Sequence, residues 1–434
     1  MPTSKTMNPN DAHARAARLP GGLLVRLPLG KTWGAADAPV KLTLSHWSSM
    51  ARLKAGHLGA LATDYVEGKV QLDGAMRDVM QTMARLLPGN PTALTDPWWR
   101  HLLQHLRALK AHTPAHDSAQ VQFHYDVSDA FYALWLDPRR VYSCAYYQNA
   151  GDGTDNSKTL ASAQEAKLDH ICGKLMLQPG ERFLDIGAGW GALLLWAAEH
   201  YGVQATGITL SKNQHQYVTE LIHDKGLAHR VHITLCDYRD LPEDPPFDKI
   251  ASVGMVEHVG QVNMGSYFAK IMRLLAPGGL VMNHSITAGG LDHRQLGAGM
   301  GDFIEKYIFP GGELLHVSAL TAHLARAGLE LLDLENLRPH YARTLWDWSN
   351  ALEAQLDEAR RLLSATSNPV QAEKTLRAYR LYLAGSAMGF EQGWMSLHQL
   401  LATRPTGEVT TAIDRHGMRG AQSVYPFDRR YMYR

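Results

Sequence analysis

The sequence predicts an α/β fold in which a parallel, Rossmann-like sheet carries helices on both faces. A short apolar run at 183–186 breaks into three glycines, Gly187, Gly189 and Gly191, and then resumes as an apolar helix. Strand-like runs then alternate with helical patterns as far as about residue 286. Such alternation is typical of parallel sheets, because a crossover between parallel strands needs a connection long enough for a helix.

The glycine-rich turn is the first candidate for a binding site. Glycine lets a ligand approach the backbone closely, and the free N–H groups at the following helix start favour polar or anionic groups. The spacing is G-x-G-x-G rather than G-x-G-x-x-G. It therefore favours a nucleoside such as S-adenosylmethionine over a dinucleotide.

Further strands are expected at 204–210, 231–235, 248–255 and 279–286, followed by a sixth at 330–337 and a closing strand at 393–403. Ligands of such sheets lie outside the carboxyl ends of the strands. The polar residues there are Asp185, Thr209, Ser211, Asp237, Tyr238, Glu257, His258 and His284. The second strand lacks the acid that usually binds ribose, and Gln214, one helical turn further on, is the candidate to replace it.

The helix before the glycine turn carries its own start signal. Residues 162–165 match a capping box, which predicts that the helix opens there. Its apolar face would consist of Leu168, Ile171, Cys172 and Leu175.

The chain divides into a loose tail at 1–20, a small N-terminal α/β domain with a linker helix at 21–115, and a catalytic domain at 116–434. Met76, Met80 and Met83 recur at helical spacing. They fit a core most simply, with a lipid-binding surface as the alternative. The linker helix at 98–112 is basic and amphipathic, so it could pack on the next domain or lie on an anionic membrane.

Composition limits the partners. The formal charge of +1 gives no general attraction to nucleic acid. The three cysteines, Cys144, Cys172 and Cys236, support neither a disulfide framework nor a metal site, so a reducing compartment is expected. No apolar run is long enough to span a bilayer, which predicts a soluble or peripheral protein.

Eight short blocks resemble the cyclopropane-fatty-acyl-phospholipid synthases and mycolic acid methyltransferases. They are HYD (124–126), VYSCAY (141–146), GAGWG (187–191), GITLS (207–211), DYRD (237–240), SVGMVEHVG (252–260), KYIFP (306–310) and FE (390–391). The likeness covers about 116–404, and the N-terminal segment looks like the small domain of bacterial members. It implies a class I S-adenosylmethionine-dependent methyltransferase fold with a seven-stranded sheet and a largely helical insertion at about 288–387.

The resemblance also implies a reaction and a site. The activity would be transfer of a methyl or methylene group from S-adenosylmethionine to a cis double bond of an unsaturated phospholipid acyl chain, with bound bicarbonate as the base. By motif, the bicarbonate would be held by the Cys144 backbone, Glu257, His284, the Ile286 backbone and Tyr341. The cofactor would be held by Tyr125, Tyr142, Ser143, Gly187, Gly189, Thr209, Leu210, Gln214, Asp237 and Tyr238. No metal is implied.

Several alternatives stay open. Glu257 and His258 could cap a helix, His284 could be a core histidine, and Cys144 and Tyr125 could be buried packing residues. The same chemistry could stop at a methylene- or methyl-branched chain, and a non-catalytic protein that binds lipid or nucleoside is a third possibility. The expected setting is the cytoplasmic face of the membrane, where the protein would be peripheral and could form a homodimer.

Two departures from the family pattern bear on the site, the first on catalysis and the second on substrate choice. Ser386 stands where some members carry a cysteine, so we assign this residue no role. The segment 289–301 is rich in glycine and could form a mobile lid beside the acyl channel.

Overall fold

The protein was analysed as a computed structural model, which describes residues 22–87, 128–148, 159–291, 297–405, 426 and 428–433. The larger of its two sheets has seven strands: β5 (Arg182–Ile186), β6 (Gln204–Thr209), β7 (Val231–Leu235), β8 (Phe247–Val253), β9 (Leu275–Ala288), β10 (Glu330–Asn336) and β11 (Met395–Thr403). Each of these lies within a few residues of a strand expected from the sequence. The predicted α/β class is therefore confirmed.

The strand order is β10-β11-β9-β8-β5-β6-β7. The five strands from β9 to β7 are parallel, whereas β11 runs antiparallel to both of its neighbours. The closing strand is thus inserted between β9 and β10, a pairing that the alternating pattern did not predict. Because β11 follows the helical insertion, this pairing fixes the insertion to the sheet.

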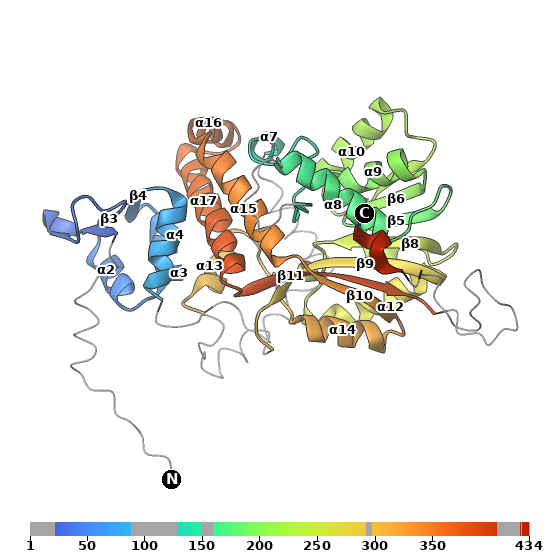
Figure 1. The fold of residues 1–434 in the computed structure, drawn as a ribbon. Coiled ribbons are helices and arrows are strands. Elements are labelled where there is room, and N and C mark those ends of the chain that lie inside the picture. The colour runs from blue at the N-terminus through green and yellow to red at the C-terminus, as the bar shows by residue number, and fades with distance from the viewer. Residues whose placement is uncertain are drawn as a thin grey trace, which may run out of the picture.

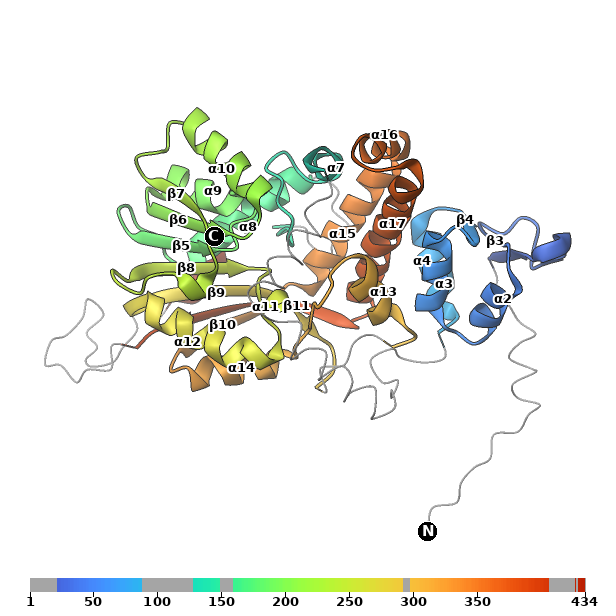
Figure 2. The same cartoon turned by 180° about the vertical axis from the view of Figure 1, so that it is seen from behind.

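Helices cover both faces of this sheet (Figures 1 and 2). One face carries α8 (Leu160–Lys174), α9 (Ala192–Tyr201) and α10 (Lys212–Asp224), and the other carries α11 (Val256–Val259), α12 (Met264–Leu274) and α14 (Val317–Arg326). The predicted apolar face of α8 is fully buried. The predicted capping box is wrong by three residues, because Thr159 is the N-cap and its hydroxyl accepts from the Ser162 N–H at 3.2 Å.

A helical layer stands at one end of the large sheet (Figure 1). It contains α15 (Arg338–Glu353), α16 (Leu356–Thr366) and α17 (Pro369–Glu391), with α7 (Asp129–Ala133) and α13 (Met300–Tyr307) beside it. A short 3-10 helix, Arg429–Tyr433, packs on α8 near the C-terminus. None of the described helices combines the length and apolar character needed to cross a bilayer.

The described N-terminal residues form a second, four-stranded sheet of order β2-β1-β3-β4. Its strands are β1 (Leu23–Arg26), β2 (Thr32–Trp33), β3 (Val40–Leu44) and β4 (Val70–Asp73), and its helices are α2 (Trp47–Lys54), α3 (Leu58–Val66) and α4 (Met76–Arg85). We call residues 22–87 the N-terminal unit. The predicted domain limits near 20 and 116 and the linker helix fall outside the described residues, so that division stays a prediction.

The core of the N-terminal unit is continuous with the core of the helical layer. Val40, Val79 and Met80 belong to the same buried cluster as Trp348 and Leu383. Helices α3 and α4 contact α17, and α3 also contacts α13. Backbone atoms touch where α3 meets the residues before α13. The Gly59 N–H donates to the Ala298 carbonyl at 2.9 Å, and a Cβ on Gly59 would lie 1.8 Å from the Gly299 oxygen.

Replacing Gly59 by alanine is therefore expected to loosen the N-terminal unit. The added methyl group has no space unless α3 moves off α13, and overpacking of this kind costs about 1–3 kcal/mol. Denaturant unfolding and limited proteolysis would measure the loss. The matched control is Gly265→Ala in α12, where the nearest atom would lie 3.8 Å from the new Cβ. Equal stability of Gly59→Ala and wild type would contradict the close contact.

Candidate active site

The glycine turn lies at the carboxyl end of β5 and leads into α9. Gly187, Gly189 and Gly191 all have positive φ, at 81°, 56° and 80°. A Cβ on Gly187 would lie 2.7 Å from the Met255 side chain, whereas a Cβ on Gly189 would meet nothing within 4 Å. The turn therefore needs glycine for its backbone shape, and at Gly189 it faces open space.

This space is the smaller of two cavities. Seven of the predicted cofactor residues line it together: Gly187, Gly189, Thr209, Leu210, Gln214, Asp237 and Tyr238. They come from the ends of β5, β6 and β7, which the parallel sheet brings to one edge. Gly254, Met255 and His258, from the end of β8 and from α11, complete the opposite side.

Gln214 has the geometry expected of a ribose-binding residue. The Thr209 hydroxyl donates to its Oε1 at 2.8 Å, which fixes the amide. Its Nε2 is buried and has no hydrogen-bond partner among the described residues. A buried donor without a partner costs free energy unless a ligand supplies an acceptor. Thr209 thus orients Gln214 and also lines the cavity itself.

Asp237 is held by its neighbour. The Arg239 guanidinium donates to both carboxylate oxygens, at 2.8 and 2.6 Å, and Oδ1 also accepts from the Arg239 N–H. The side chain is therefore fixed before any ligand arrives. The adjacent Tyr238 ring is buried and packs edge-on against Tyr267 at 5.3 Å between centroids.

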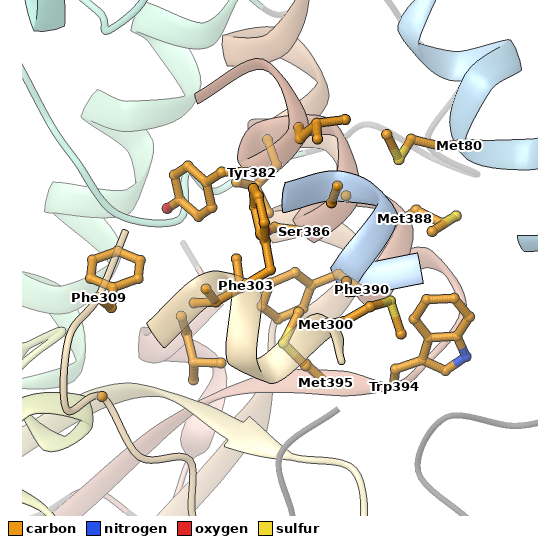
Figure 3. Close-up of a pocket in the computed structure, with 18 of the residues that line it drawn as sticks. Met80, Met300, Phe303, Phe309, Tyr382, Ser386, Met388, Phe390, Trp394 and Met395 are labelled. Atoms are coloured by element: carbon orange, nitrogen blue, oxygen red, sulfur yellow. The ribbon is translucent and has the colours of Figure 1, made fainter. Parts of the chain in front are cut away.

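The larger cavity, of about 280 Å³, is mainly apolar. Its wall includes all five residues predicted to hold an anion: Cys144, Glu257, His284, Ile286 and Tyr341. Tyr142 and Ser143, predicted for the cofactor, also lie in this wall and not among those found to line the smaller cavity. Tyr125 lies outside the described residues. Figure 3 shows the apolar part, with Phe309 and Met80 on opposite sides.

The two cavities adjoin. Gly254 and His258 line both of them. A group held over the glycine turn can thus reach a molecule in the apolar cavity past these two shared residues. This is the arrangement that transfer between a polar cofactor and an apolar substrate requires.

Glu257 lies in the short helix α11 with its carboxyl group out of water. Its Oε1 accepts from the Ile286 N–H at 2.6 Å, and its Oε2 is buried without a partner among the described residues. Burial raises the pKa of Glu257 to about 7. The predicted Ile286 donor is thus used by Glu257 here, and a protonated Oε2 can itself donate to a bound anion.

His284 is fully buried in β9. The Gln399 amide, from β11, donates to its Nδ1 at 3.2 Å, so the ring proton lies on Nε2. That Nε2 has no partner among the described residues. Burial and then the positive charges of Lys167 and Lys174 lower the pKa of His284 to about 3. His284 is therefore a neutral imidazole that presents one N–H.

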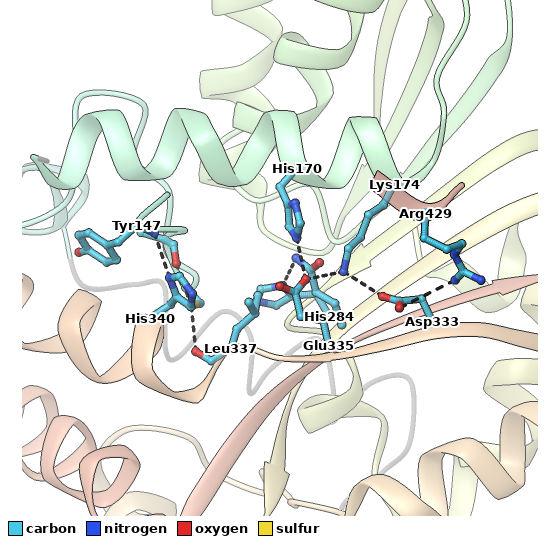
Figure 4. A network of polar contacts seen from close by, with 12 residues as sticks. Tyr147, His170, Lys174, His284, Asp333, Glu335, Leu337, His340 and Arg429 are labelled. Carbon is cyan, nitrogen blue, oxygen red and sulfur yellow. Dashed lines mark hydrogen bonds and ion pairs between the residues drawn. The ribbon is translucent and has the colours of Figure 1, made fainter. Parts of the chain in front are cut away.

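His284, Gln399 and Glu335 form a row across the neighbouring strands β9, β11 and β10. Figure 4 shows His284 and Glu335, with the contacts of Glu335 to His170 and Lys174. In the strand register, Gln399 of β11 lies opposite His284 of β9 on one side and opposite Glu335 of β10 on the other. Glu335 accepts from His170 at 2.7 Å and from Lys174 at 2.5 Å, both on α8. Burial alone would raise the pKa of Glu335, but His170 and Lys174 lower it to about 2. A permanent carboxylate thus ends the row.

Side chains of α8 also hold the preceding segment, at 142–144, in place. Lys167 donates to the Ser143 hydroxyl at 3.0 Å, and the Gln164 amide donates to the Ser143 carbonyl at 2.8 Å. The Tyr142 hydroxyl donates to the Tyr382 hydroxyl at 3.0 Å. Burial raises the pKa of the Cys144 thiol well above its usual value, so this thiol stays protonated.

Several site residues could not be found from sequence patterns. Gln399 carries no signal of its own and lies 115 residues from its partner His284. Gly254 and Met255 lie inside the block at 252–260, but the sequence assigns no role to them. The side chains of the N-terminal unit that line the larger cavity could not be recognised as site residues from the sequence either. For Met80 and Met83, the helical spacing predicted burial but left core and lipid surface open.

The sheet order, the glycine turn and the adjoining cavities define the class I S-adenosylmethionine-dependent methyltransferase fold. The sequence model described as "Mycolic acid cyclopropane synthetase" matches residues 112–400. The chain therefore belongs to the mycolic acid cyclopropane synthetase family.

Two curated relatives are long matches. A "Probable fatty acid methyltransferase" of Pseudomonas putida is 45% identical over 345 residues, covering 80% of this chain and 82% of that protein. The "Probable fatty acid methyltransferase Rv3720" of Mycobacterium tuberculosis is 34% identical, covering 89% and 88%. The solved mycolic acid cyclopropane synthase CmaA1, complexed with SAH and CTAB, has a TM-score of 0.59 and 36% identity, covering 66% of this chain and 98% of its own.

We expect Gln399→Leu to change the tautomer of His284. Without the amide donor, Nδ1 is buried and unpaired, which costs about 1–3 kcal/mol, and the ring proton gains access to Nδ1. Nitrogen NMR shifts of labelled histidine would report the tautomer. Thr287→Val is the control, because it removes a 2.9 Å contact to His398 between the same two strands. An unchanged His284 signal in Gln399→Leu would refute the positioning role.

Proposed function

We propose that the protein transfers a methyl-derived carbon from S-adenosylmethionine to a cis double bond of an unsaturated phospholipid acyl chain, forming a cyclopropane ring, with bound bicarbonate as the base. The observation that carries this proposal is the junction of the two cavities. A polar glycine-turn cavity meets an apolar one at Gly254 and His258, and the apolar wall beyond contains Glu257 and His284. Family membership supports the same reaction class.

The smaller cavity suits S-adenosylmethionine. The open space at Gly189 allows close approach to the backbone, and the unpaired Gln214 Nε2 can donate to a ribose hydroxyl. Asp237 and Tyr238 line the same cavity and are our candidates to hold the adenine ring. Bound there, S-adenosylmethionine supplies an electrophilic methyl group. The SAH in the solved relative supports this assignment.

The apolar cavity suits the acyl chain. An alkene is a weak nucleophile, so catalysis depends on holding it in line with the methyl donor. Its attack produces a carbocation that water would trap. The buried side chains of Leu345 and Phe390 line this cavity and would keep water away from such a cation. The chain would come from a membrane lipid at the cytoplasmic face, and the relatives' description as fatty acid methyltransferases supports an acyl substrate.

Two unpaired polar atoms suit a small oxyanion. His284 presents an N–H at Nε2, and protonated Glu257 can present an O–H at Oε2. Tyr341 is buried in the same wall and adds a hydroxyl. Bicarbonate held by these groups would supply a base, and both residues must keep their protons for the ion to be bound.

The product is tested with a methyl donor that carries deuterium. Purified protein, vesicles of an unsaturated phosphatidylethanolamine and S-adenosylmethionine with a trideuterated methyl group are expected to give an acyl product that retains two deuteriums. Mass spectrometry of the chains would measure this. Retention of all three deuteriums would favour a methyl branch. A methylene branch would retain two deuteriums like the ring, so proton NMR of the product must show cyclopropane signals for the proposal to hold. No product despite cofactor binding would favour a binding protein.

The pH profile tests Glu257. Its raised pKa of about 7 means that the proton is present below that pH and is lost as pH rises through it. Anion binding, and with it product formation, should then fall up to about tenfold per pH unit above that value. Glu257→Gln keeps a donor but cannot titrate, so it is expected to make less product with a flatter profile. Wild-type activity in Glu257→Gln, or the same decline, would refute the role.

A further inference from the structure

The larger cavity is not confined to the family-matched part of the chain. Eleven of the residues that line it belong to the N-terminal unit, which precedes the matched region at 112–400. They come from α3, α4 and the β3–β4 pair, and include Leu42, Tyr65, Val70, Val79 and Met80. One continuous cavity thus runs from Glu257 and His284 to the sheet of the N-terminal unit.

A rim of polar contacts holds this unit against the helical layer. Arg77 pairs with Glu391 at 3.1 Å and stacks over the Trp346 ring at 4.1 Å. Lys374 pairs with Glu67 at 2.7 Å.

Two further arginines of α17 reach α3. Arg377 donates to the Tyr65 carbonyl at 2.9 Å, and Arg380 donates to the Tyr65 hydroxyl at 2.8 Å. Contacts at this rim orient the unit, while the apolar surfaces inside it leave the cavity.

The part of the cavity lined by the N-terminal unit has buried apolar walls. Leu42, Val70 and Val79 are buried there, and Met80 reaches toward α17, where a Cβ on Gly385 would lie 3.9 Å from its sulfur. A charged head group would lose its hydration in this place without gaining a partner. A terminal methyl group loses nothing, and each buried methylene is favourable.

We propose that the N-terminal unit forms the floor of the acyl site and receives the methyl end of the chain, so that its side chains set how many carbons fit beyond the double bond. This inference rests on the proposed function for the identity of the substrate. The double bond must lie near Gly254 and His258, where the cavities meet. The distance from there to Met80 then limits the methyl-side segment. The carboxyl side points away from this floor.

Met80→Phe tests the floor. Its rigid ring reduces the depth of the cavity, and a pocket discriminates a missing or extra methylene by about tenfold or more. Vesicles would contain equal amounts of three acyl chains. Two share the double-bond position and differ in methyl-side length, and the third lengthens only the carboxyl side. For Met80→Phe, we expect the ratio of the two products that differ in methyl-side length to shift about tenfold toward the shorter one. The ratio of the two products that differ only in carboxyl-side length should not change.

Two variants serve as comparison. Met80→Ala deepens the floor and should shift the ratio toward the longer methyl side. Met50→Phe is the matched control, since Met50 is a methionine of the same unit, is 6% exposed like Met80, and does not belong to the described cavity lining. Its ratio should equal that of wild type. Unchanged ratios in both Met80 variants, or a shift in the carboxyl-side pair alone, would overturn the proposal.

A binding measurement separates this inference from the proposed function. Displacement of a fluorescent fatty acid by unlabelled fatty acids of increasing length should show a length limit that Met80→Phe shortens and Met50→Phe leaves in place. If wild type forms no product but this limit moves, the proposed reaction fails and the floor remains. If product forms and neither ratio nor limit moves, the floor fails and the reaction remains.

Discussion

The pairing of β11 with β9 is the interaction on which the site depends. It places Gln399 opposite His284 and so determines which ring nitrogen of that histidine faces the cavity. It also holds the C-terminal end of α17 beside the sheet, because only Gln392 to Trp394 separate that helix from β11. The same ladder therefore positions a polar group in the larger cavity and the helix against which the N-terminal unit packs.

Exclusion of water gives the site its chemical character. In water Glu257 would be charged and His284 partly charged at neutral pH, and neither would be a fixed donor. Burial raises the pKa of the first to about 7 and lowers that of the second to about 3. The first shift increases the share of Glu257 that can donate a proton to an anion, and the second keeps His284 neutral, so that its single N–H is directed by the Gln399 contact. The charged partners Lys174 and Glu335 lie one layer further away, where they pair with each other.

The sequence predicted what is encoded locally. The turn at 187–191 follows from three glycines at fixed spacing, and the strand ends follow from alternation, so the edge of the sheet and seven residues that line the smaller cavity could be anticipated. Pairings between distant segments could not. The insertion of β11 depends on competition among strand edges, and Gln399 gains its role only through that insertion. The helix start at Thr159 was missed because Ser162 offers the same capping chemistry one turn later.

The N-terminal unit shows why a cavity is harder to predict than a core. Met80 and Val79 have the spacing of an ordinary buried helix face, and they are indeed buried. Whether their partner is protein or empty space depends on how closely two surfaces approach. Here Gly59 lets α3 touch α13 through backbone atoms, while the arginines of α17 hold the rim. Close contact at these points fixes the distance between α17 and the N-terminal unit elsewhere. Gly385 has no side chain and Ser386 a short one, so neither fills the space between them. Small residues facing long apolar ones across such an interface therefore leave an elongated space that suits a flexible hydrocarbon chain.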